Sequence, residues 1–385
     1  MSFLAGVGNS DNLRAARFAI ADYGLIHGQV EVSLGEPLND ECNTKSGEHL
    51  GRLTTEDSQV IGIVGPTCSS TATTLSPRLS AAGMVMISPS NTSPFLTSDL
   101  TGTPGRYYYP GYYRTSYNDN YQGHALADLL TEHLSIDRAA VIHDGDAYTL
   151  GLAESFRKYF EQHDGTITDF VQLASDETEV LDTLKGIASK QPGALFLPLN
   201  EDLANAILKQ ATDLSAFDEV VVLAGDGLTS SAFLRQAFTK GIYVSTPDQR
   251  FTSGENEITG ISQQELRQRF IDTSDEMPEI GFWAHAYDAT VLLLEAIRSA
   301  SYIVPDTSQG SDPLHTLYID RARVRTYLSK VNNFQGVSGN ISCDPFGDCG
   351  EPHIDIIHNI DPSNIDNIFD NVVCSYTSES PCTPV

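Results

Sequence analysis

The sequence alternates between short apolar runs and longer stretches with helical periodicity, and this alternation constrains the fold more than any other feature. Runs of strand length that are almost entirely apolar occur at 60–64, 139–142, 194–197 and 220–223. Between such runs lie amphipathic stretches with apolar residues every three to four positions, among them 11–23, 69–82 and 203–213. Strands that alternate with helices are typical of parallel α/β construction. The sequence therefore predicts an α/β fold.

Length and charge narrow the class of protein. A chain of 385 residues exceeds what one hydrophobic core usually supports, so we expect two domains. The formal net charge of −28 would repel nucleic acid and anionic membranes, and neither is an expected partner. Because the acidic residues are spread along the chain, they indicate a solvating surface, with attraction of a cationic ligand as the alternative. No apolar run approaches the ~20 residues that cross a bilayer, so we expect no membrane insertion.

The six cysteines fall into three pairs along the chain: Cys42 with Cys68, Cys343 with Cys349, and Cys374 with Cys382. No CxxC has a matching second half, which argues against a zinc site. Close pairs flanked by Gly, Asp and Pro suit disulfides, with free thiols as the alternative, and disulfides indicate an oxidising compartment. The first residues lack the charged region and apolar core of a signal peptide, so we expect that this segment was removed or that the sequence begins late.

Small and hydrogen-bonding residues follow directly after four of the predicted strands, at 67–70, 88–92, 143–148 and 225–227. In open parallel sheets, ligands bind beyond the carboxyl ends of the strands. The shared location of these residues therefore predicts a ligand site at the strand ends.

Each of these residues also has a purely structural interpretation. Ser69 and Ser70 at a helix start present hydroxyls and backbone N–H groups to an anion, or they simply cap the helix. Asp226 can pair with an ammonium group, although an aspartate between two glycines is equally common in turns. Tyr148 can lay its ring over a ligand or pack in the core, and Thr92 can accept from an ammonium or close a turn.

Motifs for catalysis are missing from the sequence. There is no GxSxG, no GxxxxGK[ST] and no GxGxxG that opens a first β-α unit, so a nucleophile elbow and a nucleotide cradle are not expected. The ten histidines show no HExxH or similar metal spacing. A hydrolase could pair Ser69 or Ser70 with His143, but His143 and Asp144 are adjacent and would point in opposite directions on a strand. We predict no enzyme activity, no cofactor and no metal.

The stretches 39–42, 65–70, 87–97 and 141–148 give the sequence a family resemblance. Over residues 2–358 it resembles the leucine/isoleucine/valine-binding proteins, the type I periplasmic binding proteins of branched-chain amino-acid ABC importers. The resemblance implies a periplasmic or cell-surface protein that captures an amino acid or similar small carboxylate and delivers it to an importer permease. A ligand-sensing receptor domain of the same fold, without a transport role, is the alternative.

The resemblance also implies a domain organisation. Two Rossmann-like lobes with parallel-sheet cores would be joined by a three-strand hinge and would close around the ligand. Lobe 1 would comprise residues 1–116 and 248–333, and lobe 2 would comprise residues 117–247 and 334–385. Because Ser2 aligns just past the end of the first strand of the family, that strand would be missing from this chain.

Particular residues take on roles by resemblance. Ser69 and Thr92 would bind the α-carboxylate of the ligand, with the Ser90 carbonyl and Thr92 near its ammonium. Asp226 would pair with the ammonium, and Tyr148 would contribute from the second lobe.

The resemblance bears on the disulfides and on the ligand as well. The Cys42–Cys68 bridge matches a family bridge that pins the Ser69 loop, whereas Cys343–Cys349 would be an addition. Asn200 stands near a position where relatives use an aromatic residue, Asp226 is shorter than the usual glutamate, and Asn91 adds a polar group. These departures imply a ligand that is more polar than a branched-chain amino acid, or of different size.

Overall fold

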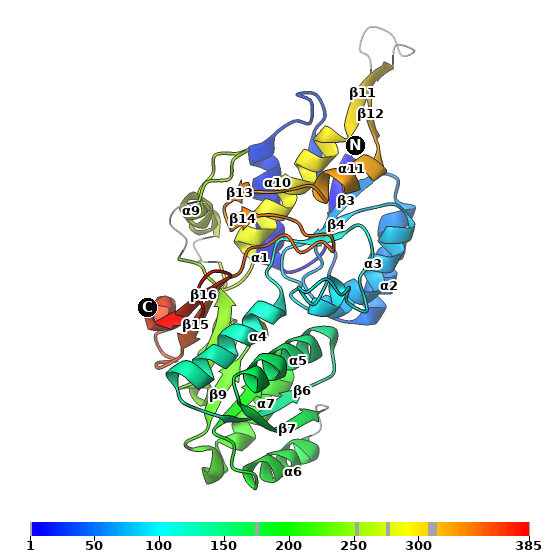
Figure 1. The fold of residues 1–385 in the computed structure, drawn as a ribbon. Coiled ribbons are helices and arrows are strands. Elements are labelled where there is room, and N and C mark those ends of the chain that lie inside the picture. The colour runs from blue at the N-terminus through cyan, green and yellow to red at the C-terminus, as the bar shows by residue number, and fades with distance from the viewer. Residues whose placement is uncertain (1, 174–176, 251–253, 275–277, 307–313, 385) are drawn as a thin grey trace. The chain divides into compact units, whose positions relative to one another are not determined.

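The computed structural model describes residues 2–173, 177–250, 254–274, 278–306 and 314–384 (Figure 1). The chain forms two compact units. Unit 1 comprises residues 1–117, 251–278 and 282–351, and unit 2 comprises residues 118–250, 279–281 and 352–385. The predicted boundary at 333/334 differs from this division. Residues 334–351 belong to unit 1 because Phe334, Val337 and Ile341 are buried in its core.

Unit 1 is built on a sheet of five parallel strands in the order β2-β1-β3-β4-β5. The strands are β1 (Ser2–Gly6), β2 (Val32–Leu34), β3 (Val60–Val64), β4 (Met86–Ser88) and β5 (Tyr112–Arg114). The expectation that the first strand is missing was wrong. β1 lies between β2 and β3, and its Leu4 and Ala5 are buried. A run of only three apolar residues between Ser2 and Gly6 was too short to be recognised as a central strand.

Six helices accompany the unit 1 sheet: α1 (Ser10–Tyr23), α2 (Thr44–Glu56), α3 (Ser69–Ala81), α9 (Gln263–Ser274), α10 (Trp283–Ser299) and α11 (Arg321–Leu328). Asparagine side chains begin two of them, because Asn9 accepts from the Asn12 amide and Asn43 from the Ser46 amide. Residues 283–297 of α10 are all buried, which explains why this helix is apolar over most of its circumference. It packs against α1, α11, β3 and β4 and forms the centre of the unit 1 core.

Two hairpins complete unit 1. One joins β11 (Ser301–Asp306) to β12 (Leu314–Ile319), and the other joins β13 (Phe334–Gly336) to β14 (Gly339–Ile341). The turn that follows β14 is closed by the Cys343–Cys349 disulfide. The other two predicted pairs, Cys42–Cys68 and Cys374–Cys382, are also bonded.

Unit 2 is built on one mixed sheet in the order β17-β16-β15-β10-β9-β8-β6-β7. The parallel part consists of β6 (Arg138–His143), β7 (Thr166–Gln172), β8 (Ala194–Leu197), β9 (Val221–Ala224) and β10 (Tyr243–Pro247). The C-terminal part adds the antiparallel strands β15 (His353–His358), β16 (Val372–Thr377) and β17 (Thr383–Pro384). A parallel-sheet core in each unit confirms the predicted fold class.

The helices of unit 2 are α4 (Asp119–Asp128), α5 (Ala147–Gln162), α6 (Glu177–Ala188), α7 (Glu201–Ala211) and the short α8 (Ser231–Leu234). α4 continues as one π-helical turn at Leu129–His133. The core on one side of the sheet gathers apolar residues of α6, α7, β8 and β15. Among the described residues, no helix has both the length and the apolar character needed to span a membrane.

Candidate functional site

In unit 1, two loops at the carboxyl ends of β3 and β4 are tied to each other. The Ser88 hydroxyl donates to the Pro66 carbonyl at 2.8 Å and accepts from the Asn91 amide nitrogen at 3.0 Å. The Ser90 hydroxyl donates to the Thr67 carbonyl at 3.1 Å. The two strand-end segments predicted from the sequence, 67–70 and 88–92, are therefore neighbours in space.

The first of these loops leads into the N-terminus of α3. Cys68 occupies the N-cap position without a side-chain capping bond, and Ser69 and Ser70 in the first turn are buried. The Asp40 carboxylate accepts from the Thr67 and Cys68 amides at 2.8 and 2.9 Å and thereby fixes the approach to the helix. The amides of the first turn have no intrahelical partner, and together with the helix dipole they favour an anion at this end.

Thr92 has the most informative side chain of the second loop. It is fully buried, and its hydroxyl has no hydrogen-bond partner within the residues that the structure describes. A buried hydroxyl without a partner costs free energy, and such groups are rare outside functional or strained sites. The Thr92 hydroxyl is thus available to a ligand at the end of the sheet where Ser69, Ser70 and Ser90 also lie.

Asn91 serves the loop itself. Its side-chain nitrogen donates to the Pro66 and Thr67 carbonyls at 3.1 and 2.8 Å, and its side-chain oxygen accepts from the Tyr112 hydroxyl at 3.3 Å. Because both ends of the amide are engaged within the protein, Asn91 positions the loop, and a contact of Asn91 with the ligand stays a prediction.

Arg114, which was not predicted from the sequence, forms hydrogen bonds with the same loop. Arg114 is fully buried at the end of β5 and forms an ion pair with Asp348. It also donates to the Asn91 and Ser93 carbonyls at 2.9 and 2.8 Å. A single arginine after two tyrosines carries no sequence signal for burial, since arginine is rarely buried without a partner and Asp348 is distant in the chain.

In unit 2, Asp226 and Tyr148 are joined directly. Asp226 begins a short 3-10 turn (Asp226–Leu228) at the end of β9, and Tyr148 lies in the first turn of α5, after β6. The Tyr148 hydroxyl donates to Asp226 Oδ1 at 3.0 Å and accepts from the Gly227 amide nitrogen at 2.9 Å. Two candidate residues that lie 78 positions apart in the sequence therefore form one hydrogen-bonded pair.

Burial perturbs both groups of this pair. Desolvation raises the pKa of Asp226 to about 6, although a hydrogen bond from Gln122 and the bond from Tyr148 favour the ionised form. Desolvation and the nearby Asp226 carboxylate raise the pKa of Tyr148 well above its ordinary value, so Tyr148 remains a hydrogen-bond donor. Desolvation makes ionisation of this carboxyl group unfavourable, and a cationic ligand group would offset that free-energy cost.

The remaining candidates of unit 2 differ in exposure. Asn200 is exposed at the N-cap of α7, after β8, and its side chain makes no capping bond. His143 is buried at the end of β6, where its ring packs against Phe170, and desolvation lowers its pKa. This packing favours a structural role for His143.

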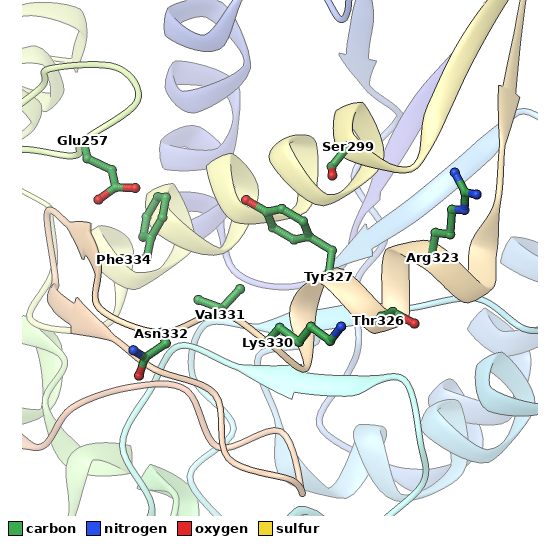
Figure 2. A pocket seen from close by; sticks show the side chains of 9 residues that line it. All are labelled: Glu257, Ser299, Arg323, Thr326, Tyr327, Lys330, Val331, Asn332 and Phe334. Atoms are coloured by element: carbon green, nitrogen blue, oxygen red, sulfur yellow. The ribbon is translucent and has the colours of Figure 1, made fainter.

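A cavity of about 430 Å³ on unit 1 involves none of the predicted residues. Figure 2 shows its lining, which comes from the end of α10, from α11 and from the segment that follows α11. Tyr327 and Phe334 supply aromatic surface, and Lys330 and Arg323 supply positive charge. The strand-end residues are thus separate from this cavity.

Comparisons with known proteins indicate the family of this chain. A family model described as "Receptor family ligand binding region" matches residues 12–361. A Leu/Ile/Val-binding protein of Rhizobium johnstonii is 22% identical over 321 residues, which cover 81% of this chain and 80% of that protein.

Solved structures of other proteins share the fold of this chain. A leucine-binding protein of Thermotoga maritima superposes with a TM-score of 0.74 at 21% identity, covering 94% of this chain and 97% of that one. A branched-chain amino-acid binding protein of Streptococcus pneumoniae, in complex with isoleucine, gives a TM-score of 0.71 at 19% identity, with 98% and 99% covered.

Proposed function

The chain belongs to the receptor ligand-binding family, among the type I periplasmic binding proteins of the branched-chain amino-acid group, and we propose that it captures an amino acid or similar small carboxylate for an ABC importer. Its relatives are solute-binding proteins, so the chain is a binding protein and not an enzyme. An extracytoplasmic location accords with these relatives and with three disulfides.

The observation that carries the proposal is the Tyr148–Asp226 pair. A carboxylate whose pKa is raised to about 6 by desolvation gains most from a cationic partner, because the cation offsets the cost of burying its charge. We assign the ligand ammonium to Asp226 in unit 2. The Tyr148 hydroxyl holds the carboxylate in place, and exposed Asn200 contributes to the side-chain end of the pocket.

The ligand carboxylate is assigned to unit 1. The first-turn amides of α3 and the hydroxyls of Ser69 and Ser70 supply donors for an anion. The Thr92 hydroxyl supplies a further donor, and the Ser90 carbonyl with the Thr92 oxygen can accept from the ammonium.

The nature of the ligand side chain follows from the departures seen in the sequence. Asn200 in place of an aromatic residue and the shorter Asp226 favour a ligand that is more polar than leucine, or of different size. The same binding chemistry would serve a sensory domain. Loss of uptake of the ligand after deletion of the gene favours transport, whereas intact uptake with loss of a transcriptional or signalling response favours sensing.

A thermal-shift screen against the amino acids and small carboxylates tests the proposal. A ligand at about 100 times its dissociation constant adds about 2.7 kcal/mol to the free energy of unfolding and raises the melting temperature. We expect a rise with a small set of polar amino acids. If none of these compounds raises the melting temperature, the proposed ligand class is wrong.

A further inference from the structure

Two histidines and an aspartate of unit 2 converge away from the strand-end residues. His124 and Asp128 lie one turn apart on α4, and His163 follows the last turn of α5. One nitrogen of each imidazole and one oxygen of the carboxylate lie within 4.8 Å of one another. Figure 1 shows α4 and α5 side by side in unit 2. We propose that this cluster binds a divalent transition-metal ion of the Zn²⁺ type.

The distances within the cluster fit an ion better than they fit hydrogen bonds. His124 Nε2 and His163 Nδ1 each lie 3.4 Å from the same oxygen, Asp128 Oδ1. This separation exceeds the 2.7–3.2 Å usual for an N–H···O hydrogen bond. It matches the edge of about 3.3 Å between two ligand atoms of a tetrahedron whose metal–ligand bonds are about 2.0–2.1 Å long.

The ligand atoms are oriented by surrounding groups, as in many metal sites. His124 Nδ1 lies 3.0 Å from the Tyr376 hydroxyl, which directs Nε2 toward Asp128. The His124 ring stacks on Tyr159 with 4.5 Å between ring centroids. Metal-bound histidines commonly hold their second nitrogen in this way, which fixes the tautomer and the direction of the ring.

Asp128 is a buried carboxylate whose second oxygen faces the C-terminal tail. Its side chain is 4% exposed, and Oδ2 lies 3.4 Å from the Cys382 amide nitrogen, a contact longer than most N–H···O hydrogen bonds. Cys382 is bonded to Cys374 of β16. A metal at Asp128 would therefore link α4, the end of α5 and the disulfide-bridged tail.

The donor set selects the metal class. Two imidazoles and one carboxylate suit Zn²⁺ and other late divalent ions, and three protein ligands leave a fourth position for water. No metal was expected from the sequence, because it contains no dense motif such as HExxH. The spacing His124-x-x-x-Asp128 places two ligands on one helix face, but the third comes from another helix and could not be assigned from the sequence.

Zinc titration of the full-length protein, first stripped with chelator, tests the proposal. We expect one equivalent of zinc chloride to bind per chain and Co²⁺ to give the visible absorption of a four- or five-coordinate ion. His124→Ala and His163→Gln should each weaken zinc binding by more than about 100-fold, and Tyr376→Phe by about 10- to 100-fold. His27→Gln removes a histidine of unit 1 and should leave zinc affinity unchanged.

A readout on the unmodified protein accompanies the variants, because a substitution at the cluster can also impair folding. Hydrogen exchange should slow at the Cys382 amide when zinc is added. The proposal is overturned if the unmodified protein binds less than one equivalent, or if the His124 and His163 variants bind zinc as tightly as His27→Gln does. Unchanged exchange at Cys382 on zinc binding would also place the ion elsewhere.

Discussion

The Tyr148 hydroxyl lies 3.0 Å from Asp226 Oδ1 and 2.9 Å from the Gly227 amide nitrogen. It therefore donates to the side chain and accepts from the backbone of the same turn, which fixes the direction of the Asp226 carboxylate. A positioned carboxylate loses little conformational freedom when a ligand arrives.

The affinity for an amino-acid zwitterion should depend on pH through Asp226. The pKa of Asp226 in the ligand-free protein is raised to about 6, and an ammonium partner favours the ionised form. Binding below this pKa must release a proton, so affinity should be constant above about pH 7 and fall by up to about tenfold per pH unit below about pH 6. Calorimetry from pH 8 to pH 5 measures this dependence. Asp226→Asn should bind weakly at every pH, and an equally steep profile in that variant would assign the proton to another group.

Asp226→Asn should stabilise the ligand-free protein at neutral pH. Because the folded-state pKa is raised above the ordinary 3.8, the contribution of Asp226 to stability is present below about pH 4 and is lost as pH rises through about 6. The amide avoids the cost of burying a charge at pH 7. The melting temperature of the variant should exceed that of the unmodified protein at pH 7, and the difference should shrink toward pH 4. A lower melting temperature at pH 7 would contradict the sign of the pKa shift.

Thr92→Val should separate folding from binding. The substitution removes a buried hydroxyl that has no partner among the described residues and keeps the shape of the side chain, so the free energy of unfolding should stay equal or rise by up to about 1–3 kcal/mol. Affinity for the ligand should fall by about 1.5–3 kcal/mol, because a hydrogen bond to a charged group is lost.

Thr73→Val provides the matched control for Thr92→Val. The Thr73 hydroxyl is buried but donates to the Ser70 carbonyl at 2.7 Å, so its loss should lower the free energy of unfolding by about 0.5–1.5 kcal/mol. Denaturant unfolding and calorimetry measure the two effects. Equal destabilisation by both substitutions would show that the Thr92 hydroxyl has a partner within the protein.

Arg114→Ala should destabilise unit 1 by about 3–5 kcal/mol, because it removes a fully buried side chain and leaves the largely buried Asp348 carboxylate, 10% exposed, without its ionic partner. The carbonyls of Asn91 and Ser93 would lose donors as well. Arg235→Ala is the control, since its ion pair with Asp366 is exposed and should contribute less than about 1 kcal/mol. Urea unfolding compares the two, and similar losses would mean that burial does not strengthen the Arg114 pair.

Much of the fold could be predicted because the strongest strands are continuous apolar runs. The strands β3, β6, β8 and β9 lie where the sequence placed them, as do the helices α3 and α7 that follow β3 and β8. β7 was missed because it is an edge strand in which polar residues at 166, 168, 169 and 172 interrupt the apolar ones. β15 was missed because charged and polar residues interrupt it. One of them, Asp355, is fully buried and is paired with Arg250.

The candidate site could be predicted only in part. Ser69, Thr92, Tyr148 and Asp226 could be proposed from the sequence because ligands bind at strand ends in parallel sheets, whatever the ligand is. The groups that position them could not be found, since Asp40, Gln122 and Arg114 act through contacts between distant segments. The hydrogen bonds of Asn91 could not be predicted for the same reason, because its partners are carbonyls of another loop.

Binding calorimetry with an amino acid and with its analogue that lacks the ammonium group is the most direct test of the central claim. The unmodified protein should bind the zwitterion far more tightly than the analogue. Asp226→Ala should weaken zwitterion binding by about 2–5 kcal/mol, or roughly 30- to 4,000-fold, while exposed Asp202→Ala leaves it unchanged. Equal affinity of the unmodified protein for both compounds, with no loss in Asp226→Ala, would contradict the account.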